Sequence, residues 1–326
     1  MALNLFTLDK DNRHTGLVSV EYAGLAYNLL TSILVVVLSD RMDNASILLE
    51  QRFYIGVITF AMVYLYRLFP CKMVMLLRIV MQLAFLTYWY PDTYQFNRLF
   101  VNRDHWFAAF EQQVFGCQPS LLFHEALPQQ VWSEAFNFGY FAYYFMIAFV
   151  VIFYFFRRYR EFERTAFILI ASFFIYYLIF IALPVAGPQY YFKAIGLEAA
   201  ENGRFPPVGY YFLHHTEMLP NPGDGSGFFH GMVESSQEAG ERPTAAFPSS
   251  HVGVSTIVMM LAWRTGCRRL FSLLLPVYVL LCCATVYIQA HYLTDAIAGL
   301  LSAIGIYYLT SWLFKKLYDY ESKRTF

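Results

Sequence analysis

The sequence predicts an all-α fold, a polytopic membrane helix bundle with about eight transmembrane helices. Of its 326 residues, 58% are hydrophobic, 20% are aromatic and only 14% are charged. The mean hydropathy is +0.43. Soluble domains carry about 25% charged residues, so this composition indicates a membrane protein. The apolar windows and the placement of the basic residues favour the same fold.

Eight apolar windows account for the predicted spans. A helix that crosses a hydrocarbon core about 30 Å thick needs about 20 apolar residues. The windows that reach or approach this length are 17–38, 53–69, 73–90, 136–156, 166–185, 251–264, 270–288 and 292–314. The window 251–264 is short and needs its flanking residues to cross. Residues 1–16 show no cleavable signal pattern, so we expect the first window to be a retained anchor.

The basic residues are divided unevenly between the two sides. With a cytoplasmic N-terminus, 15 Lys and Arg fall inside, 7 fall outside and Arg78 lies within a span. An excess of positive charge in short loops marks the cytoplasmic side. We therefore expect a multi-pass protein of the cell (inner) membrane with both termini in the cytoplasm. Arg78 and Glu21 both lie within spans; they could pair with each other or line an interior, but we expect a helix-packing or snorkelling role for them.

Two long segments, 91–135 and 186–248, fall on the outer side. The first contains NRLFVNRDHWFAAFEQQVF, whose apolar residues have near-helical spacing, and this predicts a helix in the membrane interface. The second is rich in Gly, Pro, Asn and acidic residues and is predicted to be mainly irregular. Loops of this length are usually functional or disordered, and the motifs beside them favour function.

The first chemical motif is FPSSH at 247–251, which opens the short sixth window directly from the outer loop. Ser is a preferred N-cap, and the first turn of a helix leaves unpaired N–H groups that bind anions. His251 in that turn could donate a proton to the oxygen that leaves a bound phosphoryl group. Without a second motif, an ordinary N-cap followed by a hydrogen-bonded His explains the segment equally well.

The second motif is HYLTD at 291–295, at the outer start of the last window. Residues i and i+4 share one face of a helix, so Asp295 could orient the ring of His291 and fix its tautomer. A His backed by a carboxylate is a competent nucleophile toward phosphorus. A structural hydrogen bond is the alternative interpretation of this pair taken alone.

FPSSH, followed forty residues later by HYLTDAIAG, resembles the type 2 phosphatidic acid phosphatase superfamily. The resemblance implies that His291 is the nucleophile, Asp295 its partner and His251 the general acid, with Ser249 and the backbone at Ser250 holding phosphate oxygens. It covers about residues 73–314. We therefore expect an N-terminal segment with two extra transmembrane helices at 1–70, a six-helix core with two long outer loops at 71–316, and a cytoplasmic tail at 317–326.

Two cations of the family's phosphatases are missing. The resemblance leads us to expect Ser-Arg six residues ahead of His291, where this chain has Ala284-Thr285, and a Lys seven residues before Arg242, where it has Ser235. A phosphoryl transition state needs positive charge against its oxygens. The outer-side candidates are Arg242 and Lys193, then Arg204, Arg98 and Arg103.

The resemblance implies an enzyme that acts on a lipid phosphate at the outer face, without a cofactor or a metal. The missing Arg, the segment LPVAGPQYYF and the long loops also make the chain similar to inositol phosphorylceramide synthases, which pass the phosphoryl head group to a lipid alcohol. The substrates would be a lipid phosphate or phospholipid within the bilayer, with no role for nucleic acid. Neither the head group nor the oligomeric state follows from the sequence.

Two other classes of protein could use some of these residues. A zinc hydrolase could use His251, His291 and Asp295 as ligands. The five Cys suggest neither zinc nor a disulfide framework, because Cys282 and Cys283 are adjacent within a span and only Cys117 lies in an outer loop. A transporter would be expected to show broken helices or inverted repeats, and the sequence shows no internal repeat.

Overall fold

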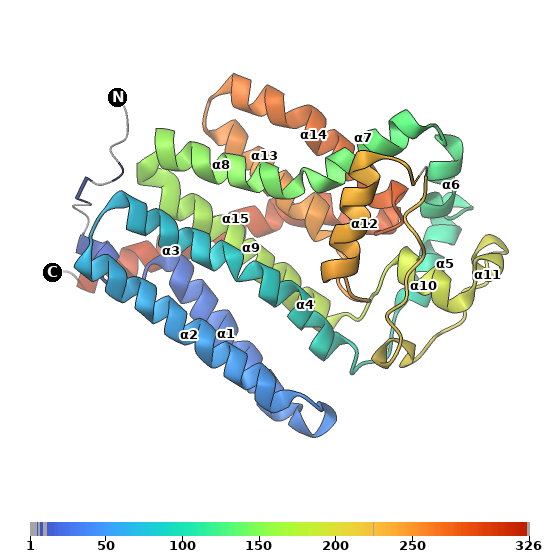
Figure 1. The fold of residues 1–326 in the computed structure, drawn as a ribbon, viewed down its shortest axis with the longest axis horizontal. Coiled ribbons are helices and arrows are strands. Elements are labelled where there is room, and N and C mark those ends of the chain that lie inside the picture. Colours follow the sequence, from blue (N-terminus) through green and yellow to red (C-terminus); the bar gives the residue numbers. More distant parts are fainter. Residues whose placement is uncertain (1–4, 6, 9–11, 224, 325–326) are drawn as a thin grey trace. The chain divides into compact units, whose positions relative to one another are not determined.

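The computed structural model describes residues 5, 7–8, 12–223 and 225–324, and its regular structure is helical (Figure 1). Within these residues the only strand-like pairing is an isolated bridge between Leu8 and Cys71. The α-helices are α1 (Ser19–Val37), α2 (Ala45–Leu68), α3 (Lys72–Ala84), α4 (Leu86–Asn97), α5 (Asp104–Phe115), α6 (Pro119–Ala126), α7 (Gln130–Phe141), α8 (Tyr143–Arg157), α9 (Phe162–Ala182), α10 (Pro188–Ile195), α11 (Leu197–Glu201), α12 (Phe228–Gly240), α13 (Ser250–Arg264), α14 (Arg268–Tyr287) and α15 (Leu293–Arg324). Short 3-10 turns lie at Asn12–Thr15, Ser39–Arg41, Tyr159–Glu161 and Tyr211–Leu213. The predicted all-α class is confirmed.

Six helical segments in the described part are long and apolar enough to cross a membrane. They are Ser19–Val37, Ala45–Leu68, Lys72–Asn97, Tyr159–Ala182, Arg268–Tyr287 and Leu293–Asp319. The helices α7 and α8 form a seventh span if they are counted together, since they meet at a bend of 44°. The remaining predicted window corresponds to α13, whose 15 residues are roughly 22 Å long and therefore shorter than the hydrocarbon core. The chain is a multi-pass membrane protein.

The predicted outer loops contain helices of their own. The helix predicted in the first of these segments is present as α5, which begins at Asp104 and ends at Phe115; its location in the membrane interface stays a prediction. The segment 186–248, predicted to be mainly irregular, holds α10, α11 and α12 with irregular stretches between them. The predicted tail is not a separate element, because α15 continues to Arg324; residues 325–326 lie outside the described residues. The sequence from Leu313 onward keeps good helix formers and no Gly or Pro, so nothing ends the helix earlier.

The Cα packing divides the chain into two compact units. The first comprises residues 1–89, 151–174 and 306–326, and the second comprises 90–150 and 175–305. Within the first unit α1, α2 and α3 lie side by side (Figure 1). The side chain of Arg78 donates to both carboxylate oxygens of Glu21, at 2.8 and 2.5 Å, and both residues are fully buried. The two in-span charges therefore pair with each other instead of snorkelling, and the pair joins α1 to α3.

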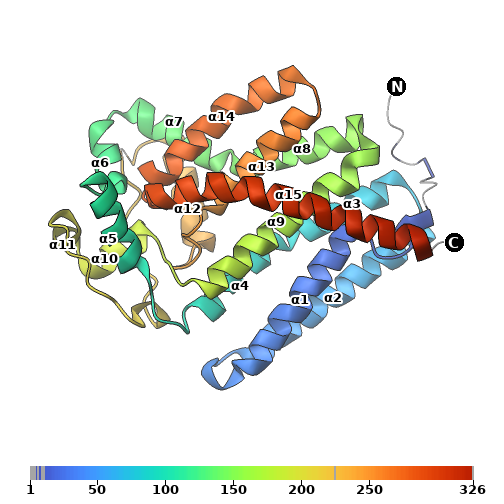
Figure 2. The ribbon, with the colours of Figure 1, turned by 180° about the vertical axis from the view of Figure 1, so that it is seen from behind.

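The second unit contains both chemical motifs. Here α14 packs on α7 and on α13, and α12 packs on α7. Figure 2 shows α13 and α14 as a hairpin, with α5 and α6 near the start of α15. The starts of α13 and α15 are in close contact, because a Cβ atom on Gly299 of α15 would lie 2.4 Å from the backbone oxygen of Ser249. Glycine at 299 thus permits the two motifs to meet.

Candidate active site

The two motif histidines lie face to face at the starts of α13 and α15. Nε2 of His291 is 3.5 Å from Nδ1 of His251, and the ring centroids are 5.7 Å apart. His291 is buried, whereas His251 is partly exposed. Because no atom fits between nitrogens this close, a phosphoryl group that binds between the rings must part them. The fold therefore brings together residues that are forty positions apart in the sequence.

A backbone carbonyl holds the ring of His291. Its Nδ1 lies 2.8 Å from the oxygen of Ala246, which can only accept, so Nδ1 carries the proton. The lone pair is then on Nε2, the nitrogen that faces His251. Asp295, the predicted partner, is 3.8 Å away through Oδ2, which is beyond hydrogen-bond distance. In this structure Ala246 sets the tautomer, and the carboxyl group of Asp295 lies close to the ring without a direct hydrogen bond to it.

Asp295 completes the N-terminus of α15. Its Oδ2 accepts from the backbone N–H of Tyr292 at 3.0 Å, while Oδ1 is buried without a hydrogen-bond partner. The carbonyl of Asp295 accepts from the N–H of Ser249 at 3.0 Å. Asp295 therefore joins the two motifs through its backbone as well as its side chain.

Burial lowers the pKa of His291 from 6.5 to about 4, and this effect outweighs the opposing influence of the Ala246 carbonyl and of Glu241. Desolvation disfavours the charged imidazolium. The ring is consequently neutral at physiological pH, as a nucleophile must be.

The two predicted serines occupy the start of α13. Ser249 is the N-cap, and its hydroxyl accepts from the N–H of Val252 at 3.3 Å. Both Ser249 and Ser250 are buried. The predicted cap is confirmed, and because it uses only an acceptor lone pair of the Ser249 hydroxyl, the O–H can still donate to a phosphoryl oxygen.

The predicted cations are not in contact with the His pair. Arg242 donates through Nη1 to the backbone oxygen of Glu241 at 2.6 Å, and Lys193 is exposed near the end of α10. Of the other candidates, Arg204 is exposed 3.9 Å from Glu198, and Arg103 lies over the ring of Trp106.

Two tyrosines that no sequence motif singles out hold the ring of His251. The rings of Tyr140 and Tyr143 each lie 4.7 Å from it. The hydroxyl of Tyr140 also donates to Glu241 at 2.7 Å, and the other oxygen of Glu241 accepts from Gln189 at 2.7 Å. An aromatic-rich span such as FNFGYFAYYF gives no signal that separates these rings from ordinary packing.

Two buried carboxylates of α5 are a second addition that the sequence motifs did not indicate. Asp104 accepts from the N–H groups of Ala186 and Gly187 at 2.7 and 2.8 Å and from the hydroxyl of Tyr292 at 3.2 Å. Glu111 accepts from the N–H of Thr294 at 3.0 Å, in the first turn of α15. Burial raises the pKa of Asp104 to about 6 and that of Glu111 to about 7.

The contacts of Asp104 and Glu111 attach α5 to residues 186–187 and to the segment that follows His291. The spacing of the two residues, seven positions on one helix, places them on the same face. That spacing was the only signal in the sequence, since nothing there indicates which segment α5 meets. Among the described residues, no group of three or more His, Cys, Asp or Glu is arranged to hold a metal ion.

A family model described as PAP2 superfamily matches residues 105–309, which include the His pair, Asp295 and the contact of Glu111 with Thr294. No curated protein and no solved structure matches the chain significantly. The match spans well over half of the sequence and lies within the predicted core at 71–316. This multi-pass membrane protein belongs to the PAP2 superfamily, the type 2 phosphatidic acid phosphatase superfamily.

Proposed function

We propose that the protein is a lipid phosphate phosphatase that works through a phosphohistidine at the outer face of the membrane. The observation that carries the proposal is the His pair: Nε2 of His291 bears the lone pair and faces His251 at 3.5 Å. Membership of a superfamily of phosphatases and phosphotransferases supports the reaction class.

In the first step, the lone pair of His291 Nε2 attacks phosphorus, and the bond from phosphorus to the lipid oxygen breaks. His251 gives its proton to that oxygen, so a lipid alcohol leaves. The N–H groups in the first turn of α13 and the positive end of that helix favour the phosphoryl oxygens. In the second step, water deprotonated by His251 attacks phosphorus, the P–N bond breaks, and phosphate departs.

The outer location follows from the predicted topology, in which FPSSH and HYLTD both open from outer loops. Tyr140 and Tyr143 would hold the ring of His251 in position for both proton transfers. Glu241, hydrogen-bonded to Tyr140, would stabilise the imidazolium that forms on His291.

The proposal is tested with lipid phosphate labelled at phosphorus. Purified protein should form an acid-labile, base-stable phosphoenzyme and release phosphate, and His291→Ala should abolish both because the nucleophile is gone. His251→Ala should slow formation most for substrates with poor leaving groups, since only those need a proton donor. Lys315→Ala, at an exposed position toward the C-terminal end of α15, is the control for purification and assay conditions. Near-normal turnover in the His291 variant would remove the nucleophile assignment.

A second candidate is a phosphotransferase in which a lipid alcohol replaces water. The observation that favours it is Thr285, which stands where the family's phosphatases have Arg. Its hydroxyl donates to the carbonyl of Cys282 at 2.9 Å, so the position supplies neither charge nor a free donor. Its backbone oxygen instead accepts from the N–H of His291 at 2.9 Å.

Acceptor choice separates the two candidates. Labelled lipid phosphate is supplied with and without ceramide or diacylglycerol, and free phosphate is measured together with labelled new lipid. Exclusive phosphate release across these acceptors excludes the transferase, whereas new lipid without phosphate release excludes the phosphatase.

A further inference from the structure

The helix α5 is apolar on its outward face and acidic on its inward face. Trp106, Phe110 and Val114, spaced four residues apart, are 55%, 55% and 53% exposed. Asp104 and Glu111 lie on the opposite face and are fully buried. A helix that meets water has the reverse arrangement. The outward face of α5 is therefore suited to hydrocarbon.

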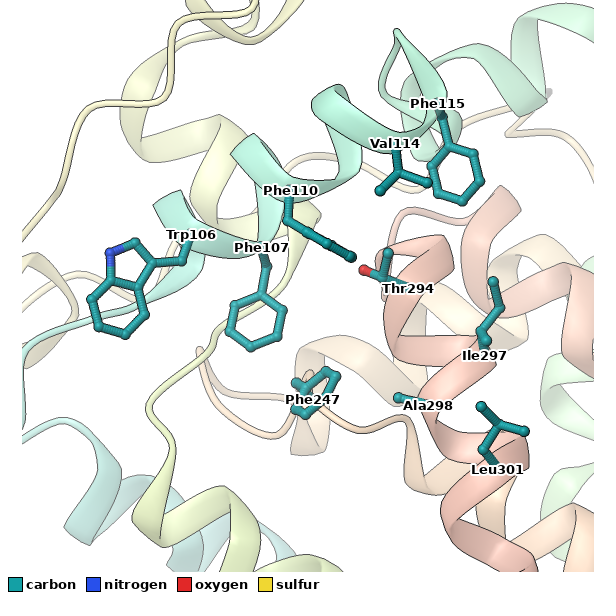
Figure 3. Close-up of a pocket in the computed structure, with 10 residues that line it drawn as sticks. All are labelled: Trp106, Phe107, Phe110, Val114, Phe115, Phe247, Thr294, Ile297, Ala298 and Leu301. Carbon is teal, nitrogen blue, oxygen red and sulfur yellow. The ribbon is translucent and has the colours of Figure 1, made fainter.

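This face forms one wall of a groove of about 460 Å³ (Figure 3). Side chains from α5 hang over one side and side chains from α15 form the other, with Phe247 between them. The residues that line it are Trp106, Phe107, Phe110, Val114, Phe115, Phe247, Thr294, Ile297, Ala298 and Leu301. Only the indole of Trp106 and the hydroxyl of Thr294 bring polar side-chain atoms to it.

The groove is continuous with the surface that α15 presents to the membrane. Ile297, Leu301 and Ile304 follow one another at helical spacing and are 45%, 61% and 46% exposed. They belong to the segment Leu293–Asp319, which is long and apolar enough to span the bilayer. An acyl chain can therefore enter from the hydrocarbon core without crossing water.

The same groove ends at the catalytic segment. The ring of Phe247 contacts Phe107 of α5 at a centroid distance of 4.7 Å. The residue before it, Ala246, holds Nδ1 of His291 through its carbonyl. At the other wall, Thr294 is the neighbour of Asp295. A chain lying in the groove would thus place its head group beside the His pair.

We propose that the α5–α15 groove seats an acyl chain of the phosphorylated lipid. This inference rests on the proposed function, because it assigns the chain of the same substrate whose phosphate meets His291. The chain passes from one apolar environment to another, so the groove selects by shape, and filling it should impair long-chain substrates more than short-chain ones.

A second apolar groove, of about 440 Å³, lies against α6, α13, α14 and α15 and provides a matched control. Ala298 lines the first groove and Cys283 the second, and both are small and partly exposed. Replacing each with Phe fills one groove at a time.

The variants Ala298→Phe and Cys283→Phe are compared on phosphatidic acid with long chains in mixed micelles and on its water-soluble short-chain analogue. We expect Ala298→Phe to raise the long-chain KM at least ten times more than the short-chain KM. Cys283→Phe should leave the ratio of the two KM values as in the wild type. An equal effect of Ala298→Phe on both substrates, or a chain-length effect confined to Cys283→Phe, would overturn the assignment.

Photo-crosslinking tests whether an acyl chain occupies the α5–α15 groove, independently of enzyme activity. Phosphatidic acid carrying a diazirine at the end of one chain is photolysed with the full-length protein in nanodiscs, and the adducts are mapped by mass spectrometry. Adducts on α5 and on Leu301, lost in Ala298→Phe, support the proposal, and adducts confined to other segments refute it. If those adducts form but neither substrate is turned over, the phosphatase proposal fails while the chain site stands.

Discussion

The ring of His291 is oriented by the carbonyl of Ala246 at 2.8 Å, and Asp295 is 3.8 Å from the same nitrogen. The side chain of Asp295 hydrogen-bonds instead to the N–H of Tyr292. In this site, the group that fixes the tautomer of His291 and the group that can stabilise its positive charge are therefore different residues. The carbonyl fixes the tautomer, and the charge of Asp295 can stabilise a positive ring during the reaction.

Asp295→Asn should therefore reduce kcat by about tenfold to a hundredfold and leave KM nearly unchanged. The amide oxygen can still accept from Tyr292, so the start of α15 is retained while the charge is lost. Steady-state measurements of kcat and KM for the wild type, Asp295→Asn and His291→Ala test this prediction. A loss as complete as that of His291→Ala would show that Asp295, not Ala246, fixes the ring.

The buried carboxyl group of Glu111, which contacts the first turn of α15, makes the stability of the protein depend on pH. Burial raises its pKa from 4.5 to about 7, so the folded protein holds this proton more tightly than the unfolded chain. The resulting contribution to stability is fully present below about pH 4.5. It is lost as the pH rises through about 7.

We expect Glu111→Gln to be more stable than the wild type above pH 7, by at most about 3 kcal/mol, and equal to it near pH 4.5. Gln keeps an oxygen for the N–H of Thr294 and has no charge to desolvate. Thermal unfolding in detergent from pH 4.5 to 8 gives the comparison. A constant difference across this range would mean that Glu111 does not titrate there.

At the scale of elements, the site depends on the close approach of α13 and α15. A Cβ atom on Gly299 would meet the oxygen of Ser249 at 2.4 Å, a contact that backbone atoms cannot relieve by a rotamer change. Gly187 has a comparable role, since its φ is +98° and a Cβ atom added there would lie 2.8 Å from the oxygen of Ala290. Glycine at both positions lets three chain segments surround His291.

Gly299→Ala should lower kcat/KM at least tenfold, because the start of α13 has to move away from His291. Gly305→Ala is the matched control. Gly305 lies on the same helix, and a Cβ atom added there would meet nothing within 4 Å. That variant should retain activity and gain helix stability of about 1 kcal/mol. Equal activity of the two alanine variants would show that the approach of the helices is not needed.

At the scale of the whole molecule, the predicted topology depends on whether the short helix α13 crosses the membrane. Its 15 residues are roughly 22 Å long, less than the thickness of about 30 Å that a span covers. The predicted topology nevertheless requires α13 to connect an outer loop to the inner loop that contains Arg264, Arg268 and Arg269. Local thinning or flanking residues would have to make up the difference.

Impermeant thiol labelling of intact cells tests this topology. A variant whose only cysteine is Ser226→Cys should be labelled at once. A variant that retains only Cys267 should be labelled after permeabilisation, because the positive charges beside it mark the cytoplasmic side. The two sites flank α13. Labelling of both from outside would show that α13 does not cross.

The sequence by itself determined the helical membrane class, most of the spans, the N-cap at Ser249 and the two histidine motifs. Each of these rests on local information: apolar length, cap chemistry or a short spacing. The pairing of Glu21 with Arg78 was left open by the sequence, which favoured a helix-packing or snorkelling role for these two charges.

Only the tertiary structure decided which groups surround His291. The carbonyl of Ala246 has no side-chain signal, and Asp104 reaches Tyr292 across 188 positions of the sequence. Glu111 meets Thr294 across 183 positions. Contacts of this range depend on where α5 packs, and that is set by the burial of its acidic face against α15 and the loop at Ala186. No sequence pattern within α5 predicts which segments it contacts, so these contacts around His291 could be found only from the tertiary structure.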